Sequence, residues 1–512
     1  MTPMDWRVRA LLAIASGAAL ALSFPNFNLS LLAWISVGLL VLASYGARPR
    51  VAPLYGFLHA LVFYPLSLPW MDVVIRQYGN VDALSAAGVL GLVGVAGGVI
   101  CAVFTWGVAL ASRRSALLTL ALAPDLWVAL EFARSHLPIF AFPWNLIGYA
   151  ASGNLALVQL TTVTGIWGLS YVVAAYGSLV AYAIVTGRQR AWKIVIATTA
   201  GLIFVGVGGR YFVPGDHPRF VAHLVQTNFE QYYEYPPDWM QVHAGDLDQL
   251  AQISVDAARK APGLVVWPES PAPFSLEDAN FAARARQIAQ QSGVDFLVGA
   301  EDWKRDAAGK WQATNSAILL NPAGQRIFTY DKIHLVPFGE YVPLRRYLTF
   351  AGKIIADLGD FTPGTEYRVG RLPMVPTYVP SAGAPFGVFI CFEAVFPEGV
   401  RRFTAGGAEL LINISNDGWF GRSAAPAQHL MMARVRAVEN RRWLLRDTNN
   451  GYTASVDPYG RIVAQLPTDV RAELDAPYDF RSDMTLYARF GDWWAWCCVL
   501  ASIALLILSL RK

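Results

Sequence analysis

Charged side chains are scarce in this chain. Only 15% of its 512 residues are Asp, Glu, Lys or Arg, whereas 54% are hydrophobic, and a soluble globular protein usually carries about 25% charged residues. The net charge of +4 is small, and no clustered basic stretch with interleaved aromatic residues is present, which argues against nucleic-acid binding. The composition predicts that a large part of the chain lies in lipid, and the length predicts more than one domain.

Long apolar runs account for the low charge. Between 210 and 489 no such run occurs, and short β-rich runs, turns and charged segments there are typical of a soluble domain. The sequence predicts three parts: a bundle of seven spans in residues 1–212, an outer domain in 213–488 and a C-terminal transmembrane helix in 489–512. Runs of spanning length begin near Leu11, Leu31, Leu54, Leu84, Leu117, Leu155 and Ile194, and an eighth covers about Trp493 to Leu510.

The basic residues between these runs predict the topology, because Lys and Arg collect on the cytoplasmic side. With the N-terminus inside, the inside segments hold most of them, while the outside loops around 74–82 and 133–154 hold one arginine each, Arg76 and Arg134. Eight spans then place both chain ends inside and the 213–488 domain outside. Alternatively, residues 5–24 form a cleavable signal peptide, which leaves the later topology unchanged.

Cysteine is scarce as well. Of four cysteines, Cys101, Cys497 and Cys498 fall in apolar runs, and only Cys391 belongs to the outer domain. A lone cysteine cannot form an intradomain disulfide, and a spare thiol in an oxidising compartment is a liability unless it has a purpose. The alternative is a buried cysteine that serves as a small hydrophobic side chain.

Reactive side chains follow three predicted strands of the outer domain, whose alternation of strands and helices favours a mixed α/β layer fold. "LVVWPES" ends in Glu269, "YDKIHLVPFGEYVP" presents Lys332 and Glu340, and "GVFICFE" delivers Cys391. Rigid strands position such groups for active sites. Each group also has a structural interpretation, as a solvated loop glutamate, a surface or ion-paired lysine, or a core cysteine.

Together these residues complete the requirements of acyl transfer. A thiol needs a base to become a good nucleophile, and a carboxylate can take its proton. A lysine, together with the backbone N–H of Phe392, can stabilise an oxyanion. A Cys–His dyad through His334 or His429 is an alternative. No HExxH, CxxC, GxGxxG or phosphate-loop pattern is present, so no metal or cofactor is expected.

Four ordered motifs, "VVWPES", "YDKIHLVPFGEYVP", "GVFICFE" and "NISNDGWFG", resemble those of the nitrilase (carbon–nitrogen hydrolase) superfamily. With membrane spans before and one after them, the whole chain is similar to the apolipoprotein N-acyltransferase family. The resemblance implies a four-layer α-β-β-α sandwich on a membrane-helix bundle in the bacterial inner membrane, facing the periplasm. It also implies a catalytic triad of Glu269, Lys332 and Cys391, supported by Glu340 and Glu393.

The reaction implied by this resemblance is a ping-pong transfer. Cys391 would take an acyl chain from a phospholipid, phosphatidylethanolamine, as a thioester and pass it to the N-terminal diacylglyceryl-cysteine of an apolipoprotein. Phe392 stands where members of the family often have tyrosine, and Tyr235 stands near an expected tryptophan, with Trp239 close by. We expect substrate contacts from Tyr235, Trp239, Trp419 and Phe420. No oligomeric state is implied.

Residues 341–361 mix apolar and basic side chains, which is typical of a lid in the membrane interface or of an ordinary surface helix. Two other functions are consistent with parts of the sequence. A membrane-tethered nitrilase-type amidase would use the same triad and resolve the thioester with water. A transporter or scaffold would need charges within the membrane, and Asp125 and Glu131 are the main ones in the predicted spans.

Overall fold

The protein is described here by a computed structural model that covers residues 4–77, 82–137, 141–232, 234–306, 309–341, 361–373 and 383–511. The chain divides into two compact units. The first, which we call the helical unit, comprises residues 1–214, 422–431 and 490–512. The second, the sandwich unit, comprises residues 215–421 and 432–489.

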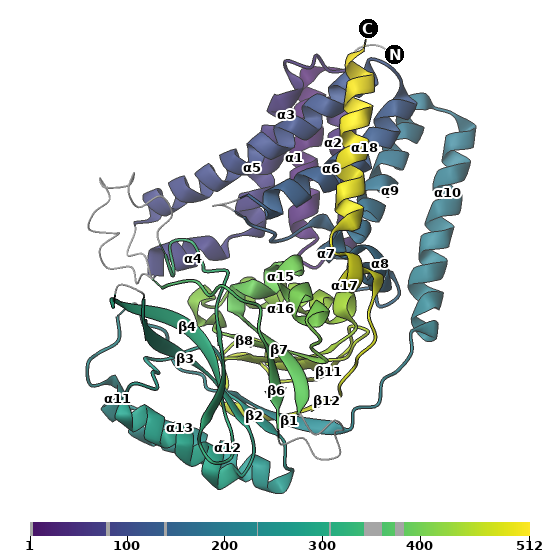
Figure 1. Ribbon diagram of the computed structural model, residues 1–512. Coiled ribbons are helices and arrows are strands. Elements are labelled where there is room, and N and C mark those ends of the chain that lie inside the picture. The colour runs from purple at the N-terminus through teal and green to yellow at the C-terminus, as the bar shows by residue number, and fades with distance from the viewer. Residues whose placement is uncertain are drawn as a thin grey trace. The chain divides into compact units, whose positions relative to one another are not determined.

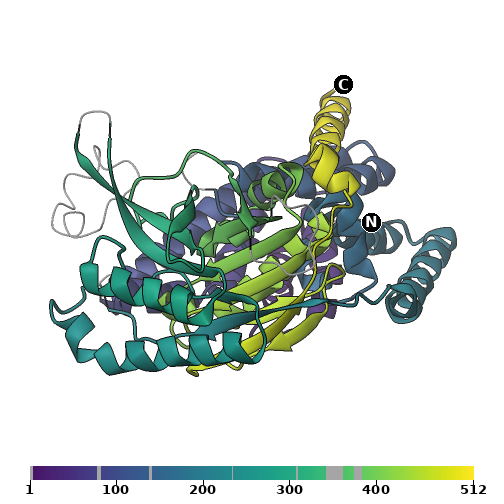
Figure 2. The same cartoon turned by 60° about the horizontal axis from the view of Figure 1, so that its bottom comes forward.

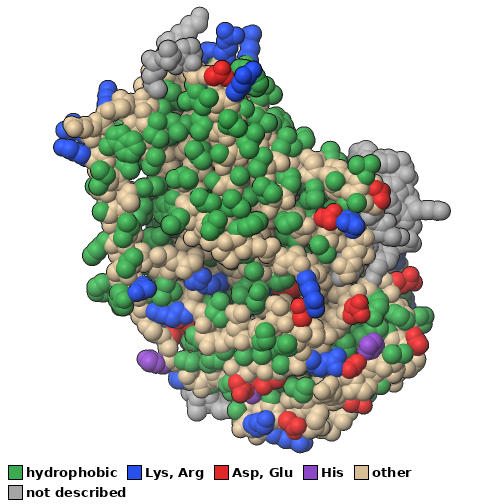
Figure 3. All heavy atoms as spheres, turned by 180° about the vertical axis from the view of Figure 1, so that it is seen from behind, with side chains coloured by type: hydrophobic (Ala, Val, Ile, Leu, Met, Phe, Trp, Pro, Cys, Tyr) green, Lys and Arg blue, Asp and Glu red, His purple; other side chains and the backbone are tan. Residues whose placement is uncertain are grey.

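The helical unit consists of helices packed against one another (Figure 1). Hydrophobic side chains cover most of these helices on the face shown in Figure 3, as expected of surfaces that face lipid. The main helices are α1 (Trp6–Leu22), α2 (Ala33–Ser44), α3 (Ala52–Ser67), α4 (Trp70–Gln77), α5 (Ala83–Ser112), α6 (Ala116–Ser135), α9 (Ile166–Thr186), α10 (Gln189–Ile203) and α18 (Trp493–Leu510), with the short α7 (Ile147–Ala151) and α8 (Thr161–Thr164).

Eight membrane spans were expected, and that number is not confirmed. Within the described residues, five helices are long and apolar enough to cross a membrane, or six if the bent pair α3 and α4 forms one span. The five are α5, α6, α9, the helical segment Gln189–Phe212 and α18. The first two predicted runs form helices of 17 and 12 residues, which lie at and below the lower end of the range of about 17–25 residues that is usual for a membrane span.

Small residues allow close helix packing in this unit. A Cβ atom on Gly38 of α2 would collide with the carbonyl oxygen of Gly177 in α9, and one on Gly56 of α3 would collide with the backbone at Cys101 in α5. Backbones that approach this closely are characteristic of membrane helix interfaces, where packing rather than the hydrophobic effect holds helices together.

The sandwich unit has four layers, as the resemblance implied. Its two six-stranded sheets have the orders β12-β1-β2-β3-β4-β5 and β11-β10-β9-β8-β7-β6. The strands are β1 (Phe220–Gln226), β2 (Leu264–Val266), β3 (Phe296–Arg305), β4 (Trp311–Leu320), β5 (Arg326–Asp331), β6 (Val369–Leu372), β7 (Ala384–Ile390), β8 (Leu410–Ser415), β9 (Trp443–Thr448), β10 (Ala454–Val456), β11 (Ile462–Gln465) and β12 (Ala472–Tyr478). Both sheets are mixed: β1, β2 and β3 run parallel, as do β7, β8 and β9, and the remaining pairs are antiparallel.

Helices cover the outer faces of the two sheets. Side chains of α12 and α13 share one hydrophobic cluster with the first sheet, and Figure 2 shows these two helices side by side across it. Residues of α15 and α16 join the cluster that includes the second sheet. The helices of this unit are α11 (Trp239–Val242), α12 (Ala244–Lys260), α13 (Ala279–Ser292), α15 (Pro397–Ala405), α16 (Ala425–Asn440), whose first residues belong to the helical unit, and α17 (Leu486–Phe490).

Local sequence explains these elements. The strands β7, β8 and β9 are buried along their whole length, which suits the nearly continuous apolar runs of parallel strands. Helix α13 begins where the Asp278 carboxylate accepts a hydrogen bond from the Phe281 N–H at 2.8 Å, and it ends at Gly293 with φ +70°. An Asp N-cap and a left-handed glycine are common helix boundaries.

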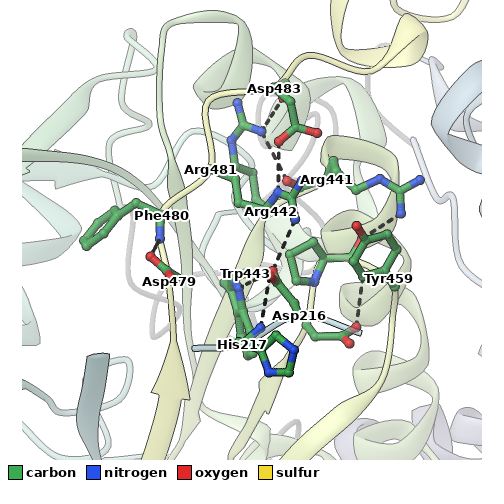
Figure 4. A network of polar contacts seen from close by, with 12 residues as sticks. Asp216, His217, Arg441, Arg442, Trp443, Tyr459, Asp479, Phe480, Arg481 and Asp483 are labelled. Carbon is green, nitrogen blue, oxygen red and sulfur yellow. Dashed lines mark hydrogen bonds and ion pairs between the residues drawn. The ribbon is translucent and has the colours of Figure 1, made fainter. Parts of the chain in front are cut away.

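A polar network ties the first residues of the sandwich unit to its last ones (Figure 4). The Asp216 carboxylate accepts a hydrogen bond from Trp443 Nε1 at 2.9 Å and pairs with Arg481 at 3.3 Å. A few residues away, Arg219 donates two hydrogen bonds to Asp479 at 2.7 Å each. The indole of Trp443, which donates to Asp216, is buried, whereas Arg219, which pairs with Asp479, is largely exposed. The contacts of Asp216 and those of Arg219 are therefore expected to differ in their contribution to stability.

We predict that Asp216→Ala lowers the free energy of unfolding by about 1–2 kcal/mol, because Trp443 Nε1 loses its acceptor and Arg481 loses a partly shielded partner. The matched variant Arg219→Ala removes an ion pair whose arginine is largely exposed and whose carboxylate keeps the N–H of Phe480 as a donor, and it should cost less than about 1 kcal/mol. Chemical denaturation of the full-length protein in detergent measures both. A larger loss for Arg219→Ala than for Asp216→Ala would contradict this ranking.

Candidate active site

Three strand ends place the predicted triad between the two sheets. Glu269 follows β2, Lys332 directly follows β5 in the same sheet, and Cys391 directly follows β7 in the other sheet. All three side chains are buried, with 5%, 1% and 6% exposure respectively. The structure therefore brings together a carboxylate, an ammonium and a thiol out of contact with bulk water.

Lys332 lies between two carboxylates. Its Nζ is 2.9 Å from Glu269 Oε1 and 2.8 Å from Glu340 Oε1. Asn315 Nδ2 donates to the same two oxygens at 2.8 Å each. Burial alone would lower the pKa of Lys332, but Glu269 and Glu340 outweigh it and raise this pKa well above its ordinary value, so the side chain is an ammonium at neutral pH.

The second oxygen of each carboxylate is fixed by a backbone N–H. Glu269 Oε2 accepts from the N–H of Asn416, and Glu340 Oε2 accepts from the N–H of Val336, both at 2.8 Å. An oxygen of a carboxylate can accept two hydrogen bonds. Glu269 Oε2 therefore retains a lone pair that can take a proton.

Cys391 begins a short 3₁₀ helix, Cys391–Val395, immediately after β7. Its φ of +49° lies in the left-handed region, where non-glycine residues are uncommon and where strained residues cluster at functional sites. Burial, and then the negative charge of Glu269, raise the pKa of the thiol above its usual range, while Lys332 opposes this shift. The resting group is thus a neutral thiol, which needs a base before it can attack a carbonyl carbon.

Glu393 links the turn that carries Cys391 to the loop that carries Lys332. Its carboxylate accepts hydrogen bonds from the Ile390 N–H on the first side, and from the Ile333 N–H and the Tyr330 hydroxyl on the other, each at 2.8 Å. Burial raises the pKa of Glu393, and these N–H and O–H donors oppose the shift. The side chain therefore fixes the two strand ends relative to one another.

The four residues expected to contact substrate, and Phe392, differ from one another in burial and in neighbours. Tyr235 is half-buried and donates to the carbonyl oxygen of Pro271 at 3.0 Å. Trp239 lies in the core beneath α12 and α13, in a different hydrophobic cluster from Cys391. Trp419 is 36% exposed and Phe420 partly exposed. Phe392 is buried, with its ring edge-to-face against Phe396 at 5.1 Å.

The two histidines of the alternative Cys–His dyad and the predicted lid segment have the following positions. His334 Nε2 lies 2.9 Å from the Tyr367 hydroxyl, and its ring stacks on Phe396 at 4.2 Å. His429 belongs to the helical unit, with its ring 5.6 Å from that of Trp144. The predicted lid falls on residues 341–361, of which 342–360 lie outside the described residues.

The sequence analysis missed three polar residues around the triad. Asn315 lies in β4 and Asn416 directly after β8, each next to a catalytic candidate. Asn416 Nδ2 donates to Gln231 Oε1 at 2.9 Å, which extends the network toward Tyr235. A buried amide within an apolar strand, as in "TNSAILL", was the available signal.

One group of described residues could hold a metal ion, and it lies away from the triad. His223 Nδ1 is 2.8 Å from Glu473 and 3.1 Å from Asp475, across the β1–β12 pair. Within the described part of the chain, Glu269 and Lys332 bond to Asn315, Asn416 and Glu340 and to one another, and not to these three residues. The groups that lie together near Cys391 are the carboxylate of Glu269 and the ammonium of Lys332.

Comparison with known proteins adds to this geometry. The chain matches the Carbon-nitrogen hydrolase family over residues 232–477 and the Apolipoprotein N-acyltransferase N-terminal domain over residues 16–179. It is similar to curated apolipoprotein N-acyltransferases of Geobacter metallireducens (35% identity, 98% of this chain and 95% of that one), Methylococcus capsulatus (33%, 94% and 92%) and Azotobacter vinelandii (34%, 98% and 94%). A chain with these apolar helices, this sandwich and this full-length similarity belongs to the apolipoprotein N-acyltransferase family, whose members are membrane-bound enzymes of the carbon–nitrogen hydrolase superfamily.

Proposed function

We propose that the chain transfers a fatty acyl group from a phospholipid to the N-terminal amine of a diacylglyceryl apolipoprotein, through a thioester on Cys391. The observation that supports this most directly is the cluster in which Lys332 and Asn315 bridge Glu269 and Glu340 beside a buried thiol. The family relationship supports the choice of lipid and lipoprotein as substrates.

The first half-reaction forms the thioester. Glu269 takes the proton of the Cys391 thiol, and the sulfur attacks the ester carbonyl carbon of the phospholipid. The Lys332 ammonium and the Phe392 N–H stabilise the resulting oxyanion. The intermediate then expels the glyceryl oxygen, which takes the proton from Glu269 and leaves as a lysophospholipid.

The second half-reaction uses the same groups. The α-amine of the apolipoprotein attacks the thioester carbonyl carbon, and Glu269 takes the proton that the nitrogen loses. The carbon–sulfur bond breaks, and the proton held by Glu269 returns to the sulfur. Each half-reaction therefore restores the Glu269 carboxylate, the second also restores the Cys391 thiol, and no proton is consumed overall.

We also propose the placement of the chain. The Arg and Lys distribution supports cytoplasmic ends, a membrane bundle in residues 1–212 and a C-terminal helix in 489–512, with the catalytic domain 213–488 on the periplasmic side of the inner membrane. The exposure of Trp419 and Phe420 supports a role for them in contacting lipid substrates. Contacts from Tyr235 and Trp239 remain predictions from the resemblance.

Incubation of the purified full-length protein with phosphatidylethanolamine should add one acyl mass to Cys391, removable by hydroxylamine. Cys391→Ser should be folded and should gain no thioester, whereas Cys497→Ser, at an exposed position in α18, should be acylated normally. Mass spectrometry of intact protein and peptides measures the adduct. Absence of the adduct on the wild type would sink the acyltransferase proposal.

The acceptor separates the proposed transferase from the amidase alternative. We predict that a diacylglyceryl lipopeptide with a free α-amine discharges the preformed thioester at least about 100-fold faster than water alone, since a positioned amine gains from proximity and orientation. The N-acetylated lipopeptide is the matched control and should give the rate of water alone. Discharge that is independent of the free amine would favour the hydrolase.

Glu269→Gln should slow thioester formation by about 10²–10⁴-fold, the usual contribution of a general base. Glutamine keeps the shape of the side chain but cannot accept the thiol proton. Glu277→Gln, at an exposed position, is the control for the loss of one carboxylate. Rapid-quench measurement of the adduct gives both rates, and near-normal acylation in Glu269→Gln would show that another group is the base.

Glu393→Gln should reduce both stability and acylation, because the amide N–H₂ of glutamine would face N–H donors that a carboxylate accepts. We expect a loss of about 2–4 kcal/mol in unfolding free energy, since several bonds to one buried charged group are affected. Tyr330→Phe removes only one of these donors and should cost about 1–2 kcal/mol. Chemical denaturation and the thioester assay test the pair, and equal effects would refute the bridging role of Glu393.

A further inference from the structure

A second cluster of ionisable residues lies within the helical unit. Helices α1, α3, α5 and α6, which pack together (Figure 1), contribute to a cavity of about 40 Å³. One water molecule needs about 10–15 Å³ on the same measure, so the cavity can take a group of a few heavy atoms. His59, Glu131, Arg134 and Asn145 line it, and each is more than nine-tenths buried.

These side chains present polar atoms without partners. Among the described residues, His59 Nε2, Glu131 Oε2, Arg134 Nη1 and both amide atoms of Asn145 make no hydrogen bond. Buried polar groups in native proteins are nearly always paired, and ionisable residues within membrane spans are characteristically functional. The cavity therefore has the features of a binding site for a small polar group.

The hydrogen bonds around the cavity define which atoms are acceptors. Ser16 Oγ donates to the carbonyl oxygen of Ser36 at 2.6 Å, so at its 2.9 Å contact with His59 Nδ1 it must accept. Nδ1 then carries the proton, and Nε2 of the neutral ring offers a lone pair. Glu131 Oε1 accepts from the Ile147 N–H at 2.7 Å, which leaves Oε2 as a second acceptor.

Asn145 supplies the third acceptor through Oδ1. Its backbone φ of +51° lies in the left-handed region, which asparagine enters more readily than most residues. A primary ammonium group carries three N–H donors, equal to the number of these acceptors. Aromatic faces also stabilise cations, and four aromatic side chains line the same cavity: Phe63, Tyr64, Phe104 and Trp127.

Arg134 adds a site for a negative group. It lies in the last turn of α6, three residues beyond Glu131, which places it about 4.5 Å further along the helix axis and on the same face. An ethanolamine head group, with its ammonium and phosphate two carbons apart, can address Glu131 and Arg134 together. The two side chains have no net formal charge, which suits a zwitterion better than a lone cation or anion.

We propose that this cavity binds the primary ammonium group of a lipid. The head group of an aminophospholipid fits best, and the α-ammonium of a lipoprotein N-terminus offers the same chemistry from another source. The inference extends the proposed function, because both of its substrates carry a primary amine. It concerns binding within the helical unit and can be tested without thioester formation on Cys391.

Binding is measured by native mass spectrometry on the full-length Cys391→Ser protein, delipidated in detergent. The probes are phosphatidylethanolamine, its N-methyl and N,N-dimethyl derivatives, and phosphatidylcholine with the same acyl chains. Each methyl group removes one N–H donor, so the affinity should fall at each step. Phosphatidylcholine should bind at least about tenfold more weakly than phosphatidylethanolamine, as expected for loss of hydrogen bonds to a charged group.

Glu131→Gln and His59→Phe should each lower the affinity for phosphatidylethanolamine about tenfold and leave that for phosphatidylcholine unchanged. Glu131→Gln preserves side-chain shape, and its melting temperature reports whether the fold is kept. The control Asp72→Asn neutralises a partly exposed carboxylate on α4 outside the cavity and should retain the head-group preference.

A lipopeptide with a free α-amine and its N-acetylated form distinguish the two sources of the ammonium. If the free-amine lipopeptide displaces phosphatidylethanolamine and the acetylated form does not, the cavity accepts both amines. If neither displaces it, the site is specific for the phospholipid. Either result supports an ammonium site.

Equal affinity across the methylated series, or a preference that persists in both cavity variants, would overturn the proposal and leave ordered water as the occupant of the cavity. The Cys391→Ser protein cannot form the thioester, so this assay and the acylation assay fail independently. Loss of acylation with normal head-group preference would refute the transferase mechanism alone.

Discussion

The buried ammonium of Lys332 is the constraint on which the proposed catalytic centre depends. An unpaired charge in a protein interior is very costly, so Lys332 requires the carboxylates of Glu269 and Glu340 within hydrogen-bonding distance. Those carboxylates in turn require Asn315 and two backbone N–H groups. The three loops that carry these residues are thereby fixed in one arrangement, and that arrangement leaves an oxygen of Glu269 able to take a proton.

The proposed nucleophile comes from the other sheet, so its position relative to Lys332 depends on contacts between the two sheets. Cys391 lies at the end of β7, whereas Glu269 and Lys332 follow strands of the first sheet. The sheets are held together by the hydrophobic cluster between them, but apolar packing alone specifies register loosely. Glu393 adds directional bonds between the turn after β7 and the loop after β5, which sets the thiol relative to the ammonium.

The sequence predicted the parts of this site that depend on local order. Strand-like runs that end in Glu269, Lys332 and Cys391 were sufficient to place these side chains in one sandwich, and the motif resemblance implied its four layers. The left-handed backbone of Cys391 and the bridging role of Asn315 depend on contacts between distant strands, which residue patterns do not encode. Trp239, expected at the substrate, is buried in the cluster beneath α12 and α13, and its contact with substrate stays a prediction.

The number of spans in the helical unit is not confirmed, because apolar runs do not report helix length. The runs near Leu11 and Leu31 form helices of 17 and 12 residues, at and below the lower end of the usual length of a membrane span. Glu131 was noticed in the sequence as an intramembrane charge, but its neighbours in the cavity come from α3 and from the loop after α6. Only the packing of the helices brings His59 and Asn145 beside it.

The two buried polar clusters differ in one physical respect that matches their proposed roles. Around Lys332, the ammonium and both carboxylates have hydrogen-bond partners and only Asn315 Oδ1 is left over, which fixes the geometry needed for a transition state whose charges must be met without rearrangement. Around Glu131, several donors and acceptors are left over, and the free energy of pairing them becomes available only when a complementary group enters. A preorganised cluster favours reaction, whereas an unsatisfied one favours binding, and the stepwise effect of amine methylation measures how much of that binding comes from the three acceptors.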